Sequence, residues 1–380
     1  MNYKKLCAVP MLVFAGLALF ATAFADDSNH DKLGPYQVLP TIVIPDTALS
    51  GVFDISWVDS DNSRYYLTDR GNVTATPPVP ARIDVIDTKH DKFLYSIKLP
   101  LPITGNGVVA IQKSHDDEEE GTGELWVGAS NSTAIVIDVK TQSIVASIPT
   151  HGTAAGTARA DELSYDPDHH LILIANDRDN PPFVSFLSTE TRTEIGYIEF
   201  PQAIFGGTNH GLEQSVWDGK KGKFYLAVPA TSTNTNGEID EIDPVSKTVT
   251  HVIPTTCSPA GLALIPGQRL MTSCGDVVDI GTSTTTHAAN VSADEIWFNP
   301  GDDRVYFGGF VSAAVLSALP PYSPVGTGTL PWTGFLTPPP PQFSHSIAAD
   351  SENNQIFLPV TNVGVMVFTD EADHGEGEGN

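Results

Sequence analysis

The chain has 380 residues, with 46 acidic against 20 basic side chains and a formal net charge of −26. This acidic excess argues against nucleic acid and anionic membranes as partners, because both are bound through basic surfaces. The chain is rich in glycine (32) and proline (29), and after residue 25 no run of ten or more residues has apolar positions at helical spacing. We therefore expect an all-β chain with many turns.

Residues 1–25 have the pattern of an export signal. Two lysines precede an apolar run over 6–20, and an Ala-Phe-Ala cleavage site ends at Ala25. The run is short for a membrane span of about 20 residues, and no later stretch is long enough to insert into a membrane. We expect a cleaved signal peptide and a mature chain, from Asp26 onwards, that is periplasmic or secreted.

One unit recurs along the rest of the chain. Residues 286–309, THAANVSADEIWFNPGDDRVYFGG, combine a histidine, an acidic position, a short strand, an Asn-Pro-Gly turn and a second strand. The same order returns at 151–176 and at 210–228. Seven such units, 34 to 54 residues apart, align on an acidic slot that holds Asp54, Gly107, Asp161, Glu213, Ala260, Asp294 and His345. Repeats of this length and content predict a seven-bladed β-propeller over 26–370.

The two ends of this repeat array are expected to meet in one blade. The last unit ends at Phe368 after about three strands, and 36–44, YQVLPTIVI, can supply the fourth. An N-terminal strand that closes the last blade removes the exposed sheet edges of an open ring.

Two segments fall outside the repeat. The proline-rich stretch 319–341 is expected to be an extended, partly polyproline loop, which either covers one face or is pinned to the blade beneath by its aromatic residues. Residues 371–380 are expected to form a disordered acidic tail.

The mature chain has two cysteines, Cys257 and Cys274, on either side of a predicted hairpin that turns at Pro266-Gly267. In an exported protein such a pair is expected to form a disulfide. Two buried free thiols are the alternative.

The segment 124–150, ELWVGASNSTAIVIDVKTQSIVASIPT, resembles the YVTN-type repeat of bacterial exported seven-bladed propellers, and LILIAND (171–177) and KFYLAV (223–228) fit it too. The resemblance covers nearly the whole mature chain and implies the propeller fold. At the level of fold, this superfamily includes surface proteins, binding proteins and lactonases related to gluconolactonase and regucalcin. The Glu-Gly-Pro opening usual in the gluconolactonase group is missing here, so the resemblance implies no set of metal ligands.

The first strand of each propeller blade lines the central channel, so the acidic slots are expected to converge there. The catalytic candidates are the carboxylates in the slot or beside it, namely Asp161, Glu162, Glu213, Asp294 and Glu295. The candidate metal ligands are one slot carboxylate and the histidines in the slot or before it, namely Asp54, His151, His210, His287 and His345. The alternative is a structural role, in which slot side chains bond the backbone of the next blade.

Carboxylates that converge on a narrow channel repel one another and must take up protons or cations. A divalent metal ion is the simplest remedy. Imidazole together with carboxylate favours iron, zinc or manganese over calcium.

The chain has no Gly-x-Ser-x-Gly elbow, no His-Glu-x-x-His motif and no phosphate-binding loop. The leading hypothesis is a metal-dependent hydrolase or lactonase that acts on a small-molecule substrate at the channel mouth. The second is a non-catalytic scaffold that binds a protein or glycan ligand, and the third is a non-haem iron oxygenase with a histidine-rich site. The protein is expected to be a monomer.

Overall fold

The computed structural model describes residues 36–46, 52–112, 123–151, 158–206, 209–310, 312–333 and 343–369. These residues form strands, turns and bends without a helix. Accordingly, no described segment is a helix long and apolar enough to cross a membrane. The strands make seven four-stranded antiparallel sheets and one short hairpin, β14 (Phe205–Gly206) with β15 (Asn209–His210).

Six of the seven sheets are meanders of four consecutive strands, which we number as blades 1 to 6. Blade 1 consists of β2 (Phe53–Asp59), β3 (Arg64–Asp69), β4 (Arg82–Asp87) and β5 (Lys92–Lys98). Blade 2 consists of β6 (Gly105–Gln112), β7 (Gly123–Ala129), β8 (Thr133–Asp138) and β9 (Ser143–Pro149). Blade 3 consists of β10 (Leu163–Asp166), β11 (Leu171–Asn176), β12 (Phe183–Ser188) and β13 (Thr193–Glu199). Blade 4 consists of β16 (Ser215–Asp218), β17 (Lys223–Val228), β18 (Glu238–Asp243) and β19 (Thr248–Pro254). Blade 5 consists of β20 (Leu262–Ile265), β21 (Arg269–Thr272), β22 (Asp276–Asp279) and β23 (Thr284–His287). Blade 6 consists of β24 (Glu295–Asn299), β25 (Arg304–Gly308), β26 (Ser312–Ser317) and β27 (Pro324–Thr333).

Blade 7 joins the two ends of the repeat array. It consists of β28 (Ala348–Asp350), β29 (Gln355–Val360), β30 (Gly364–Thr369) and the N-terminal strand β1 (Gln37–Val38). Val38 pairs with Phe368, and Ile42 makes a further bridge to Val365. Pro40 separates the two contacts because proline has no amide hydrogen to donate. The prediction that an N-terminal strand closes the last blade is confirmed.

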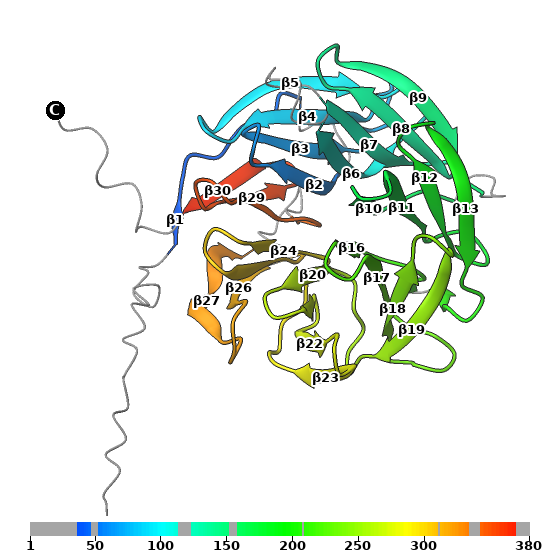
Figure 1. The fold of residues 1–380 in the computed structure, drawn as a ribbon. Helices are drawn as coiled ribbons and strands as arrows, with labels where there is room; N and C mark the ends of the chain where they lie inside the picture. The colour runs from blue at the N-terminus through cyan, green and yellow to red at the C-terminus, as the bar shows by residue number, and fades with distance from the viewer. Residues whose placement is uncertain are drawn as a thin grey trace, which may run out of the picture. The chain divides into compact units, whose positions relative to one another are not determined.

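The blades form a ring (Figure 1). The first strand of each blade is the innermost, and contacts run in order through β2, β6, β10, β16, β20, β24 and β28 and back to β2. The prediction of an all-β, seven-bladed β-propeller is confirmed.

The core lies between the blades rather than within a single sheet. In β7, Leu125 and Val127 pack against blade 1, whereas Trp126, between them, packs against blade 3. Both faces of a middle strand are therefore buried, which explains why sequences such as ELWVGA are almost continuously apolar. The blades approach so closely that a Cβ on Gly128 would lie 2.1 Å from the carbonyl oxygen of Asp161, so the position requires glycine.

Two further sequence predictions concern turns and cysteines. Asp166 and Asn299 accept hydrogen bonds from backbone amides two residues ahead, so the predicted turns at both positions are confirmed. Cys257 and Cys274 are within disulfide-bonding distance, with their Cα atoms 6.0 Å apart, on either side of the hairpin formed by β20 and β21.

The proline-rich stretch differs from its prediction. Residues 324–333 form β27, the outer strand of blade 6, and are not a polyproline loop. β27 pairs with β26 through two register shifts, and an outer strand tolerates proline because one of its edges needs no amide donors. The predicted signal peptide at 1–25, the tail at 371–380 and Phe335 lie outside the described residues, so their roles stay predictions.

Candidate functional site: the central cavity

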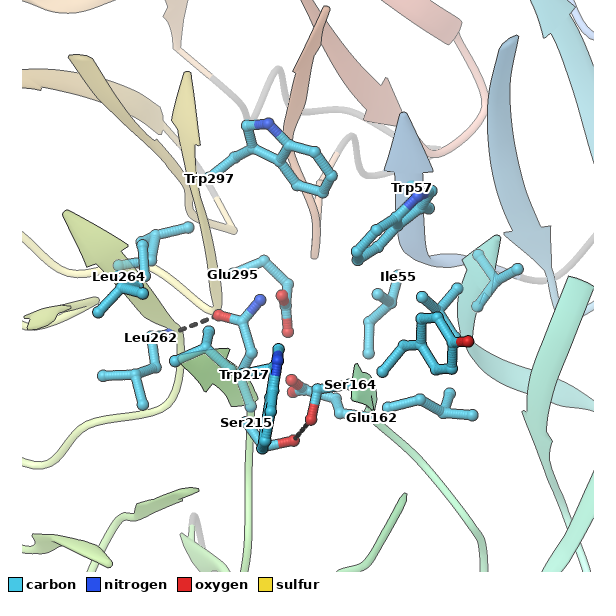
Figure 2. Close-up of a pocket in the computed structure, with 18 of the residues that line it drawn as sticks. Ile55, Trp57, Glu162, Ser164, Ser215, Trp217, Leu262, Leu264, Glu295 and Trp297 are labelled. Atoms are coloured by element: carbon cyan, nitrogen blue, oxygen red, sulfur yellow. Dashed lines mark hydrogen bonds between the residues drawn. The ribbon is translucent and has the colours of Figure 1, made fainter. Parts of the chain in front are cut away.

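A cavity of about 460 Å³ lies among the inner strands β2, β6, β10, β16, β20 and β24. Its wall is largely apolar, with residues such as Ile55, Leu163 and Leu264. Three tryptophans, Trp57, Trp217 and Trp297, also line it (Figure 2). The indole rings of Trp57 and Trp297 meet edge to face, with their centroids 5.2 Å apart.

Serine and glutamine side chains of the wall bond to neighbouring blades, whereas the Nε1 atom of Trp217 has no partner. Ser164 and Ser215 join blades 3 and 4 through their hydroxyl oxygens, 2.6 Å apart. The Oε1 atom of Gln214 accepts a hydrogen bond from the backbone amide of Leu262 at 2.5 Å, which joins blades 4 and 5. The hydroxyl groups of Ser56 and Ser346 link blades 1 and 7 at 2.9 Å. These contacts hold the inner strands together.

Two carboxyl groups, of Glu162 and Glu295, line the cavity and face one another at its floor (Figure 2). They come from the start of the inner strands of blades 3 and 6, and both residues are buried, with 5% and 4% of their surface exposed. The Oε2 atom of Glu162 has no hydrogen-bond partner. Such an atom is costly to bury and calls for an explanation, such as a catalytic role or a bound water or ion.

Burial raises the pKa of both carboxyl groups. The pKa of Glu295 rises to about 8, because burial outweighs the opposing hydrogen-bond interaction with Glu162. The pKa of Glu162 is raised well above its usual value by burial and then by the neighbouring charge of Glu295. Two buried carboxylates in contact cannot both ionise cheaply, so at neutral pH the pair keeps a proton.

The residue before each of these glutamates is paired with an arginine or a histidine instead. Asp161 forms an ion pair with Arg159, which also binds Asp177 at 2.9 Å. Asp294 accepts a hydrogen bond from Nδ1 of His345 at 2.8 Å. In the same way, Asp54 is paired with Arg70.

Burial also changes the pKa values of the aspartates in these pairs. Burial raises the pKa of Asp161, although Arg159 opposes the rise, and burial raises the pKa of Asp177 to about 7. Glu213, at the start of the inner strand of blade 4, is 6% exposed. Its pKa is raised well above the usual value by burial and by the charge of Asp294. Of the predicted catalytic carboxylates, Asp161, Glu162, Glu213 and Glu295 are buried and Asp294 is half-buried. Only Glu162 and Glu295 among them line the cavity.

The candidate histidines do not all lie with the carboxylates near the channel. The ring of His151 stacks on Tyr197, an outer-strand residue of blade 3, with centroids 3.6 Å apart. His287 ends β23, the outer strand of blade 5, and its ring bonds Asp276 at 2.9 Å; this hydrogen bond raises the pKa of His287. His345, by contrast, lies beside a slot carboxylate, Asp294. His210 has its backbone in β15, and its side chain is outside what the structure describes.

The expected convergence of these histidines on the channel is thus not found for His151 and His287. Each comes shortly before an acidic slot in the sequence, but the connection between two blades runs from an outer strand to the next inner strand. A residue near the start of that connection therefore lies at the outer rim of the propeller, away from the channel.

Among the described residues, metal-binding atoms of three side chains come close together in one place, at Cys257, Asp276 and His287. Cys257 is in the disulfide, which leaves two donors. Metal binding by the predicted ligands stays a prediction, and the described side chains do not assemble a histidine-rich centre.

The three tryptophans were not singled out from the sequence. Their signal was a shared position: Trp57, Trp217 and Trp297 each lie one or two residues before the Asp or Asn that begins the turn of the first hairpin. Aromatic residues are common in strands, so this position alone did not distinguish a cavity wall from a blade interior.

Comparison with known proteins supports the fold and gives no information on function. No protein-family model matches the chain, and no curated protein is similar to it in sequence. Among solved structures, a chain of the "Crystal Structure of Mitotic Checkpoint Complex" superposes with a TM-score of 0.57 at 14% identity, over 96% of this chain and 99% of that one. That chain is a propeller of the WD40 type. The YVTN-type resemblance remains a resemblance of sequence pattern.

Proposed function

We propose that this propeller is an exported protein that binds a small molecule in its central cavity. The observation that carries the proposal is the Oε2 atom of Glu162, buried without a partner in a cavity whose serine hydroxyl groups and Gln214 Oε1 are engaged between blades. A cavity of about 460 Å³ is in the range of small-molecule sites, and apolar and aromatic walls with few polar groups are typical of them.

A cavity-filling variant tests this proposal. Ala110 lines the cavity on β6, and Ala110→Phe should occupy it, whereas Val145→Phe adds bulk to the exposed outer strand of the same blade. The probe is the neutral dye N-phenyl-1-naphthylamine, followed by its fluorescence. We expect saturable binding to the wild type and to Val145→Phe, and a loss of at least about tenfold in affinity for Ala110→Phe. Equal binding to all three proteins would show that the dye, and by extension the ligand, does not use the cavity.

Hydrolysis is the second candidate, favoured by the carboxyl pair. A carboxyl group whose pKa is about 8 can donate a proton at neutral pH, which is the role of a general acid. Because the described histidines do not gather at the channel, this proposal assigns the chemistry to Glu162 and Glu295. The metal-dependent and iron-oxygenase hypotheses, and the hypothesis of a protein or glycan partner, stay predictions from the sequence.

The hydrolase proposal predicts slow cleavage of simple neutral substrates such as phenyl butyrate and dihydrocoumarin. The rate should fall about 100-fold in Glu162→Gln and in Glu295→Gln, stay unchanged in Glu190→Gln on an exposed turn, and be insensitive to EDTA. Full activity in both cavity variants would remove the pair from the reaction. Loss of activity in EDTA, restored by one metal, would favour the metal-dependent hypothesis.

A further inference from the structure

We propose that the ligand of the central cavity is an organic cation, with an apolar body and a single protonated amine that binds between Glu162 and Glu295. This inference rests on the proposed function and names its ligand class. It depends on three features of the cavity: the number of open polar contacts, the sign of the charge around them, and the nature of the walls.

The wall presents few open polar groups to a ligand. The serine hydroxyls and Gln214 Oε1 are engaged with neighbouring blades, as described above. The open acceptor at the floor is Glu162 Oε2, and the indole Nε1 of Trp217 is a donor without a partner. A sugar or other polyhydroxyl ligand would leave most of its hydroxyl groups without partners in an apolar space, which costs free energy for each one. A ligand with one polar end and an apolar remainder fits this distribution.

The charge around the floor is negative. No lysine, arginine or histidine is among the described residues that line the cavity. The nearby arginine and histidine side chains are already engaged: Arg159 with Asp161 and Asp177, Arg70 with Asp54, and His345 with Asp294. The charges of Asp294 and Asp161 act on Glu295 in addition. An anionic ligand would be repelled, whereas an ammonium group would supply the positive charge that these carboxyls otherwise obtain from a proton.

The walls suit the body of such a ligand. Trp57, Trp217 and Trp297 surround the space above the two glutamates (Figure 2). Indole rings bury a large apolar area, and their faces carry negative charge density that favours a nearby cation. A bare divalent metal would make no use of these rings. No three of the described channel carboxyl groups bring ligand atoms within 4.8 Å of one another.

Three probes of one shape and different charge test the inference. These are 4-phenylbutylamine, 4-phenylbutan-1-ol and 4-phenylbutyrate, titrated by calorimetry against the full chain at pH 7.5. We expect the amine to bind at least about tenfold more tightly than the alcohol, and the carboxylate not to bind. Glu162→Gln should remove the preference for the amine, and Glu190→Gln, the same substitution on an exposed turn of the same blade, should preserve it.

The outcomes separate this inference from the proposed function. Equal affinity for amine and alcohol would overturn the cation inference and leave cavity binding intact. If the amine does not bind while N-phenyl-1-naphthylamine still binds, the cation inference is overturned and cavity binding remains intact. If the dye also fails to bind, the proposed function fails with it. Displacement of the amine by millimolar calcium chloride would identify an inorganic cation site and overturn the inference. Glu295→Gln provides a second test if Glu162→Gln does not fold, as judged by circular dichroism.

Discussion

Asp161 and Glu162 are neighbours in the chain, but their surroundings differ. Each has one carboxyl oxygen without a hydrogen-bond partner, but Asp161 forms an ion pair with Arg159, whereas Glu162 lines the cavity. Blade 6 repeats the contrast, with Asp294 bonded to His345 and Glu295 at the cavity floor. In each couple, which lies at the entry to an inner strand, one carboxyl meets an arginine or a histidine and the other lines the channel. The contrast suggests that the aspartates hold blades together and that the glutamates serve a ligand.

The largest effect is expected from removing the cation on the aspartate side. Arg159→Met would leave Asp161 and Asp177 buried without it, and breaking a buried ion pair in this way typically costs about 3–5 kcal/mol. Urea unfolding would measure the loss. Arg178→Met is the control, because Arg178 is more exposed and lies 3.7 Å from Asp177. A loss below about 1 kcal/mol for Arg159→Met would contradict a structural role for this network.

A smaller loss is expected when one carboxylate of that network is neutralised. Asp161→Asn keeps Asp177 as a partner for Arg159, so the cost should be about 1–3 kcal/mol, as for a buried polar group that loses its partner. The same unfolding experiment measures it. A stabilised Asp161→Asn variant would mean that the ion pair contributes less than the burial of its charge costs.

Glu162→Gln should change stability little, within about 1 kcal/mol, although it removes the amine preference. No cation holds the Glu162 carboxyl, and an amide replaces a group that burial already keeps protonated. Urea unfolding of Glu162→Gln beside Asp161→Asn compares the two neighbours directly. An equal and large loss in both would erase the distinction between them.

The pH dependence of stability follows from the raised pKa values. A carboxyl whose folded-state pKa lies above its unfolded value stabilises the fold fully below the unfolded pKa, and this contribution is lost as pH rises through the folded pKa. Burial raises the pKa of Asp177 to about 7 and those of Glu295 and Asp240 to about 8. We therefore expect the melting temperature to fall between pH 5 and pH 9. The melting temperature should fall less steeply with pH in Glu295→Gln, because this substitution removes one titrating group. A flat profile in the wild type would contradict the raised values.

The sequence sufficed for the architecture because the evidence for a propeller is repetitive. Residues such as Asp166 and Asn299 fix the turns locally, and seven copies of a weak pattern support one another. The closing strand was predictable because the last unit lacked one. β27 was not, because prolines argue against a strand unless the strand is known to lie at a sheet edge.

The candidate site was only partly predictable. Carboxylates near the slot were identified, since an acidic residue at the start of an inner strand must lie near the axis. Which of two adjacent acids reaches the cavity depends on the exact twist of β10 and β24, and the sequence does not encode that visibly. His151 and His287 were placed too close to the axis, because distance along the chain says little about position on a connection that crosses a whole blade.

The most direct test of the account is to measure how the Glu162–Glu295 pair titrates, by carbon NMR of protein labelled at the glutamate carboxyl carbons, with Glu162→Gln and Glu295→Gln for assignment. The account predicts a glutamate signal that titrates near pH 8, disappears in Glu295→Gln, and moves to lower pH when 4-phenylbutylamine saturates the cavity. If both glutamates titrate near about 4.3, the ordinary value for this side chain, and do not respond to the amine, the pair is neither buried together nor open to a ligand, and the central claim is wrong.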